Sequence, residues 1–273
     1  MTAQPPATPT AGAYAPVNGL NLYYELHGDP AAGRPLVLLH GGVLSIDLGF
    51  GPVLASLAQL HRVIAVDLQG HGRTADPGRP MSLPALADDV AGLLDHLGVA
   101  RADLFGASLG AFVALELALT RPERVGRAVL ASIPYRPDGY LPEVAPATFR
   151  PDSDRMPTAA DFTAWKAEYE RIAPDPGAFA DLVTHASAMV GALTGWSAEQ
   201  LSQVRCPTLL LIGDHDFVGI PHAAEMLELI PDAQLAVLPG SSHMDVCMAR
   251  RPAQILATIL PFLAEDPATD TPA

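Results

Sequence analysis

Several residue types that mark particular protein classes are scarce in this chain. It has 273 residues but a single lysine, Lys166, and its 16 basic side chains face 30 acidic ones, for a net charge of −14. Nucleic-acid binding needs basic side chains that displace counterions from phosphates, and no basic stretch is present. We therefore expect no nucleic-acid partner. The negative net charge favours solubility and does not specify a fold.

Cysteine and long hydrophobic runs are also scarce. Cys206 and Cys247 are the only cysteines, at no metal-ligand spacing, which favours reduced or buried thiols. No apolar run has the length of a membrane span. The segment 1–16 has no lysine or arginine and four prolines, unlike a signal peptide. We expect a cytoplasmic protein without a membrane partner, with disordered tails at 1–16 and 265–273.

Hydrophobic residues make up 49% of the chain, enough for a sizeable core. Several short runs are apolar throughout instead of alternating, which suits parallel strands covered on both faces. The expected strands are Leu20–Leu26, Pro35–His40, Arg62–Val66, Ala102–Gly106, Arg127–Ser132, Thr208–Gly213 and Gln234–Leu238. Helical patterns separate them, one from the N-cap Ser82 to Gly98 and one from Ser108 to about Thr120. This alternation predicts an α/β fold with a doubly wound, mostly parallel sheet.

Residues 134–203 interrupt this alternation. They hold eight prolines, both tryptophans and half of the chain's aromatic residues, with helices expected at 159–172 and 176–193. The segment is either a helical layer with its own core or a cap over a pocket, and we favour the cap because ligands of α/β sheets bind beyond the carboxyl ends of strands. We thus expect a core of 17–133 and 204–264. Candidate substrate-binding residues, each of which could instead be a core residue of the cap, are Trp165, Tyr169, Phe179, Met189 and Trp196.

The segment Gly106-Ala107-Ser108-Leu109-Gly110 joins an expected strand to an expected helix. The two glycines allow a close approach of strand and helix, and the turn would expose the Ser108 hydroxyl at the end of the sheet. A serine hydroxyl needs a general base and a group that orients this base. His243, in the loop after the last expected strand, is the candidate base.

The candidate acids follow the strand that ends at Gly213. A carboxylate there can accept the imidazole N–H and stabilise the cation formed during attack. Asp214 could simply cap the turn, so we prefer Asp216, which lies further along the loop. Metal catalysis by His215, Asp216 and His243 is disfavoured, because the chain has no helical His-x-x-x-His or paired Cys-His spacing. Phosphate and dinucleotide loops are disfavoured by the missing lysine and by the glycine spacing, and no cofactor is expected.

The motifs in this order resemble the α/β-hydrolase family over roughly residues 17–263. They are the Ser108 turn, His40-Gly41-Gly42, the stretch 67–74, the acid loop 213–216 and Gly240-Ser241-Ser242-His243. The family places its acid three residues after the glycine, which is Asp216 here, and its cap where 134–203 lie. The resemblance also implies an oxyanion hole made by the backbone N–H groups of Leu109 and Gly42, with Val43 as an alternative donor and a tentative substrate contact.

The sequence therefore predicts a serine hydrolase that cleaves a carboxylic ester or lactone of a small, mostly apolar substrate through an acyl-enzyme. Amide, thioester and C–C bond hydrolysis and cofactor-free perhydrolysis remain open, since the same three side chains serve all of them. A small-molecule sensor with slow turnover is the alternative from another class. His40, His71 and Cys247 are expected to have structural roles.

Overall fold

The computed structural model describes residues 12–144, 150 and 153–264, in which strands and helices alternate. The strands are β1 (Ala13–Val17), β2 (Leu20–His27), β3 (Leu36–Leu39), β4 (Val63–Val66), β5 (Ala102–Ala107), β6 (Val125–Ala131), β7 (Thr208–His215) and β8 (Ala233–Ser242). The α-helices are α1 (Ile46–Ala58), α2 (Leu83–His96), α3 (Leu109–Thr120), α4 (Ala159–Ile172), α5 (Phe179–Gly191), α6 (Ala198–Leu201), α7 (Ile220–Leu229), α8 (His243–Cys247) and α9 (Pro252–Leu263).

These strands form one sheet in the order β1-β2-β4-β3-β5-β6-β7-β8. The β1–β2 and β2–β4 pairs are antiparallel, and the other neighbours are parallel. The predicted α/β class with a mostly parallel sheet is confirmed. The carboxyl ends of β5, β6 and β7 therefore meet at one edge, where polar side chains from distant segments can come together.

Helices cover both faces of the sheet, and the central strands β3, β4, β5 and β6 are buried throughout. One buried cluster joins α2 and α3 to the sheet, and a second joins α1 and α9 to its other face. This two-sided burial explains why the strand sequences are apolar without alternation.

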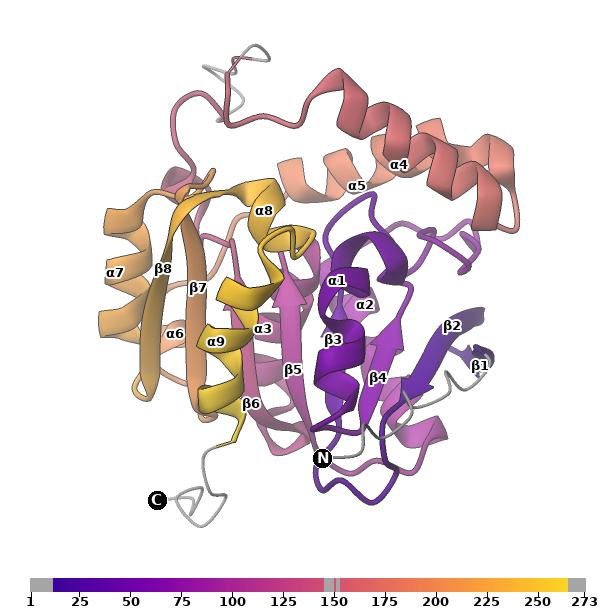
Figure 1. The fold of residues 1–273 in the computed structure, drawn as a ribbon, viewed down its shortest axis with the longest axis horizontal. Helices are drawn as coiled ribbons and strands as arrows, with labels where there is room; N and C mark the ends of the chain where they lie inside the picture. The colour runs from indigo at the N-terminus through magenta and orange to yellow at the C-terminus, as the bar shows by residue number, and fades with distance from the viewer. Residues whose placement is uncertain (1–11, 145–149, 151–152, 265–273) are drawn as a thin grey trace, which may run out of the picture.

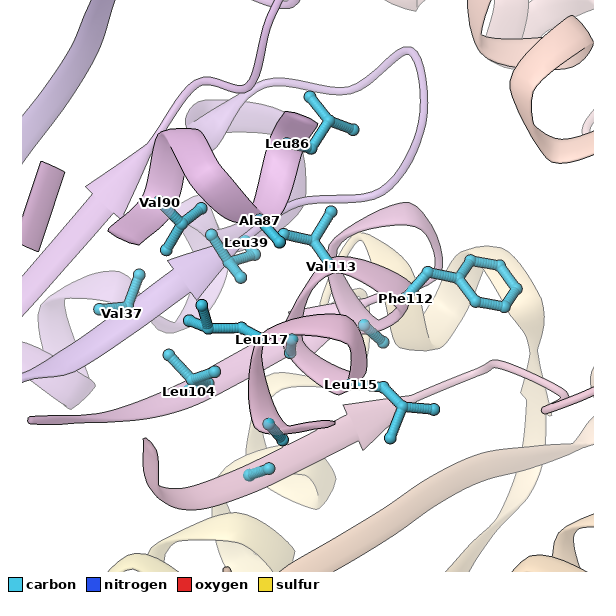
Figure 2. Packing of buried hydrophobic residues seen from close by; sticks show 14 of the residues in the cluster. Val37, Leu39, Leu86, Ala87, Val90, Leu104, Phe112, Val113, Leu115 and Leu117 are labelled. Atoms are coloured by element: carbon cyan, nitrogen blue, oxygen red, sulfur yellow. The ribbon is translucent and has the colours of Figure 1, made fainter. Parts of the chain in front are cut away.

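Helix α3, which begins directly after Ser108, lies deep in the core. Figure 2 shows Val113 of α3 pointing toward Ala87 of α2, with Leu117 close to Leu104 of β5. Almost every side of the helix is buried, as expected for a helix that is apolar all round. The serine at its N-terminus is therefore held by a rigid element.

Helix α2 has the boundaries that its sequence predicts. The Ser82 hydroxyl accepts a hydrogen bond from the Ala85 N–H at 3.4 Å, and Pro84 occupies the first turn. The helix ends before Gly98, whose φ of 65° is the left-handed conformation that glycine adopts without strain.

The predicted tails need one correction. Residues 13–16, which we assigned to a disordered tail, belong to β1, because their backbone pairs with β2 from Ala13–Tyr24 to Val17–Leu20. Pro16 is tolerated since β1 is an edge strand, where one missing N–H costs no ladder bond. Residues 1–11 and the predicted tail at 265–273 lie outside the described residues.

The segment between β6 and β7 contains the two helices predicted for it, α4 and α5. Figure 1 shows both beyond the end of the sheet toward which β5 points, the same end at which α8 lies. None of the described helices combines the length and the apolar character needed to cross a membrane.

Candidate active site

Ser108 occupies a strained turn between β5 and α3. Its φ of 49° lies in the left-handed region that side chains rarely adopt. The turn needs both flanking glycines: a Cβ on Gly110 would lie 1.9 Å from the Leu39 carbonyl oxygen, and one on Gly106 would lie 2.3 Å from that of Gly110. Ser108 is half-buried at the carboxyl end of β5, where the motif predicts it.

His243 lies between Ser108 and Asp216. Its Nε2 is 3.2 Å from the Ser108 Oγ, and its Nδ1 is 2.8 Å from the Asp216 Oδ1. Because an ionised carboxylate can only accept, Nδ1 carries the proton and Nε2 is left free to accept the serine proton. Residues 108, 216 and 243 are thus joined by a continuous chain of hydrogen bonds.

The Asp216 carboxylate is 1% exposed and is bound on both oxygens. Oδ1 accepts from the Phe217 N–H at 2.6 Å, and Oδ2 accepts from the Ser132 hydroxyl at 2.5 Å and the Gly213 N–H at 3.3 Å. Burial opposes the charge, but His243 and these donors outweigh it and hold the pKa of Asp216 below its usual range. The carboxylate therefore stays ionised next to the imidazole.

His243 is almost fully buried, and burial alone would lower its pKa. The neighbouring Cys247 and the Asp216 carboxylate both raise it, and the net pKa lies above the usual value. Of these two groups, the Asp216 carboxylate accepts a hydrogen bond directly from the imidazole Nδ1, at 2.8 Å. This arrangement favours the protonated histidine that forms when a base accepts a proton.

Asp214, the alternative acid, has a different environment. Its side chain is exposed, and its Oδ1 accepts from the Ser241 N–H at 3.1 Å. Backbone donors from Gly240 and Ser241 lower the pKa of Asp214. This carboxylate therefore connects the end of β7 to the end of β8, whereas Asp216 contacts the imidazole itself. His243 is the first residue of α8 and directly follows β8, so it does not lie in the loop that we predicted.

The predicted oxyanion donors lie beside Ser108. A Cβ on Gly41 would be 3.6 Å from the Ser108 Cβ, and one on Gly42 would be 3.9 Å from the Leu109 Cβ. Leu109 is the first residue of α3, where backbone N–H groups have no acceptor within the helix. The two candidate donors are thus close to the serine and to each other.

His40 and His71, near the Gly41-Gly42 turn, have the structural roles that we expected. The Nδ1–H of His40 donates to the Gly41 carbonyl at 2.8 Å, and its Nε2 accepts from the Leu68 N–H at 3.1 Å. Burial lowers the pKa of His40 to about 3 and that of His71 to about 4, so both rings are neutral. His40 thereby fixes the Gly41-Gly42 turn against the loop after β4.

The six tentative substrate-binding residues fall into two groups. Trp165, Tyr169 and Phe179 belong to the buried cluster that includes residues of α1, and Val43 packs against this cluster. Met189 and Trp196 belong to the cluster that includes residues of α3. Their contact with a substrate remains a prediction for both groups.

Trp165 and Trp196 also differ in their hydrogen bonds. The Trp196 indole N–H donates to Glu116 at 3.1 Å, and its ring stacks on Phe112 of α3. The Trp165 N–H is buried and has no partner among the described residues. Trp165 lines a small hollow together with Val43 and Tyr169.

Comparison with known proteins identifies the family of this chain. A family model described as "Alpha/beta hydrolase family" matches residues 36–258, most of the chain. The chain belongs to the α/β-hydrolase family. A protein named "Putative carbamate hydrolase RutD" from Azorhizobium caulinodans is 32% identical to this α/β hydrolase over 247 residues, which cover 84% of this chain and 91% of that protein.

Solved structures of similar fold include two enzymes. The enol-lactonase from Burkholderia xenovorans LB400 is 25% identical, with a TM-score of 0.69 over 92% of this chain and 100% of that one. A serine hydrolase involved in carbazole degradation, the CarC enzyme, is 22% identical with a TM-score of 0.77 and covers 95% and 100% of the two chains. The similarity to the CarC enzyme shows a shared fold alone. The family match and these relatives support hydrolase activity.

Three contacts of this α/β hydrolase were not anticipated from its sequence. Ser132 donates to Asp216, Phe217 stacks on His243, and Arg155 Nη1 donates to the Asp216 carbonyl at 2.9 Å. A polar residue directly after β6, the neighbour of β7, was a usable signal for Ser132. No local pattern marks Arg155, which is distant from Asp216 in sequence.

Among the described residues of the α/β hydrolase, no group of three or more histidine, cysteine, aspartate or glutamate side chains could hold a metal ion.

Proposed function

We propose that this α/β hydrolase cleaves a carboxylic ester or lactone of a small, mostly apolar molecule through a covalent acyl-enzyme. The observation that carries the proposal is the hydrogen-bonded chain from Ser108 Oγ through His243 to Asp216. Its order along the sequence, serine, acid, histidine, is that of the α/β-hydrolase arrangement.

In the proposed reaction, Ser108 Oγ attacks the carbonyl carbon while His243 Nε2 takes the hydroxyl proton. The negative charge moves to the carbonyl oxygen, where the N–H groups of Leu109 and Gly42 stabilise it by about 3 kcal/mol per donor. His243 returns the proton to the leaving alkoxide. A water molecule activated by the same imidazole then hydrolyses the acyl-enzyme and releases the acid.

Carbamate hydrolysis is the second candidate, because the relative from Azorhizobium is named a carbamate hydrolase and is similar over most of this chain. The same side chains can attack a carbamate carbonyl. Loss of the alcohol leaves a carbamoyl-enzyme that water releases as the carbamic acid, and loss of the amine leaves an alkoxycarbonyl-enzyme that water releases as a carbonic acid monoester. Amide, thioester and C–C bond cleavage, perhydrolysis and a slow sensor remain compatible with the same three residues. We propose that residues 134–203 form the cap that selects among these substrates.

The test is a substrate panel that shares one apolar acyl or alkyl group and has matched leaving groups where the bond allows it: a p-nitrophenyl ester, an N-alkyl p-nitrophenyl carbamate and a p-nitroanilide, together with the γ-lactone that carries the same alkyl group. We expect the ester or lactone to have the highest kcat/KM, and a fluorophosphonate probe to label Ser108, located by peptide mass spectrometry. A higher kcat/KM for the carbamate would favour the second candidate. Stoichiometric binding without turnover of any member would favour the sensor.

The unpartnered indole of Trp165 leads to a further expectation about the substrate. A buried N–H without an acceptor destabilises the protein, and a bound acceptor would remove this cost. The hollow that Trp165 shares with Val43, the residue after Gly42, has no room for a water molecule in this structure. We therefore infer that the side chains around Trp165 move apart when substrate binds, and that the Trp165 N–H then donates to a substrate oxygen other than the scissile carbonyl.

Trp165→Phe keeps an aromatic ring and removes the N–H. For an ester with a second carbonyl we expect kcat/KM to fall about fivefold, and for the matched all-hydrocarbon ester less than about twofold, because one hydrogen bond contributes about 1 kcal/mol. Steady-state kinetics on the two esters measures the difference. An equal loss on both would refute the substrate contact and indicate a packing role.

A further inference from the structure

An aromatic ring lies against the imidazole of His243. The ring centroids of Phe217 and His243 are 4.1 Å apart, and the two planes differ by only 13°. The Phe217 N–H donates to Asp216 Oδ1 at 2.6 Å, the oxygen that also accepts from His243 at 2.8 Å. One residue thus contacts the carboxylate with its backbone and the imidazole with its side chain.

The backbone of Phe217 is also fixed on its other side. Its carbonyl accepts from the Leu141 N–H at 2.8 Å, and two residues further on the Gly219 N–H donates to the Gly139 carbonyl at 3.0 Å. Tyr140 and Val218 form an antiparallel bridge between these two hydrogen bonds. The position of the half-buried ring is therefore set by the segment after β6 as well as by its own loop.

Face-to-face stacking has two consequences for the imidazole. Rotation of the His243 ring would break its bonds to both Asp216 and Ser108, and it would also displace the ring from the face of Phe217. When His243 accepts a proton it becomes a cation, and the face of an aromatic ring attracts a cation within about 6 Å of its centroid. The ring thus stabilises the protonated state formed during attack more than the neutral resting state.

We propose that Phe217 is a positioning residue of the Ser108 site, whose ring holds the His243 imidazole in the plane that reaches both partners and stabilises it once it is protonated. This inference rests on the proposed function, because it takes His243 as the group that carries the proton.

The other groups that act on His243 stay in place when the ring is removed. They are Asp216 from the loop after β7, Cys247 at the end of α8, and the Ser108 hydroxyl. Tyr140 lies near Asp216 and Cys247. Burial and these two groups raise the pKa of the Tyr140 phenol, so the phenol remains uncharged. A substitution that keeps the backbone of residue 217 therefore isolates the effect of the ring.

Phe217→Leu removes the ring and keeps the N–H that binds Asp216. We expect kcat on the best ester to fall about fivefold to thirtyfold with KM changed less than twofold, which corresponds to the range of cation–π attraction. The acid limb of kcat/KM should move to lower pH, because an imidazolium that loses a stabilising contact has a lower pKa. Phe217→Tyr, which keeps an aromatic ring at this position, should retain most of the wild-type kcat.

Tyr14→Leu is the matched control. Tyr14 is 52% exposed on β1 and its ring packs edge-on against Tyr23 at 5.2 Å, so the substitution removes an aromatic contact far from Ser108 in the fold. We expect its kcat to be unchanged. An equal fall of kcat in both leucine variants, at an equal loss of Tm, would show a general structural effect and overturn the proposal.

NMR titration of the His243 imidazole needs no substrate and separates this inference from the proposed function. In Phe217→Leu we expect a lower His243 pKa and altered ring-proton shifts, since the adjacent ring current is lost. Unchanged titration and unchanged kcat would overturn the positioning role. If the wild type hydrolyses no member of the panel, the proposed function fails, while the titration still decides whether Phe217 acts on His243.

Discussion

Ser108→Ala should lower kcat on the best ester by about 10⁴- to 10⁶-fold, because it removes the only atom that forms the acyl-enzyme. A residual rate about 10³-fold above the uncatalysed reaction should remain, since Gly42 and Leu109 would still stabilise the oxyanion. Single-turnover kinetics with mass spectrometry should detect an acyl adduct in the wild type and none in the variant.

The variant should fold normally. The strain at position 108 comes from its φ of 49°, which alanine shares with serine, so Tm should change by no more than about 2 °C. Ser202→Ala is the control, because it removes a serine hydroxyl away from the site. Ser202 is exposed, and its hydroxyl donates to the Glu199 carbonyl. Retention of more than about a tenth of kcat in Ser108→Ala would mean that another group attacks the carbonyl.

The sequence was sufficient for features that depend on local pattern. The all-apolar runs predicted the parallel strands because such runs are stable only when both faces are covered, and the two glycines around Ser108 predicted a turn that no other residue could form. The catalytic candidates followed from strand ends, since parallel strands bring their carboxyl ends to one edge. These inferences use only the spacing of apolar residues and the order of the motifs, and both can be read directly from the sequence.

Features that depend on pairing between distant segments were not predictable in this way. The segment 13–17 is short and contains a proline, and its strand character comes from its partner β2. Phe217 is an aromatic residue in the loop after β7 with no local pattern around it, and its contact with His243 depends on the loop geometry and on Leu141. Composition likewise could not assign Trp165 and Trp196 to two different buried clusters, because both are aromatic residues of the one segment between β6 and β7.

Asp216→Asn should lower kcat by about 10⁴-fold, and Asp214→Asn by less than about threefold. An amide at 216 presents an NH₂ group to donors that now bind a carboxylate, and it cannot hold His243 in the tautomer that leaves Nε2 free. At 214 an amide oxygen can still accept from Ser241, so the turn is kept. Both variants remove one negative charge, which makes each the electrostatic control of the other.

The two variants should also differ in pH dependence. The Asp216 carboxylate raises the pKa of His243, so its removal should lower that pKa and leave the neutral, base-competent imidazole populated at lower pH. The acid limb of the residual kcat/KM in Asp216→Asn should therefore move to lower pH, whereas in Asp214→Asn it should stay in place. If Asp214→Asn instead abolishes turnover and Asp216→Asn leaves it largely intact at equal Tm, Asp214 is the acid and the short contact of Asp216 with His243 has only a structural role. If both are inactive and both fold, residues 213–216 act as one unit, in which Asp214 holds the end of β8 through Ser241 and Asp216 holds the imidazole.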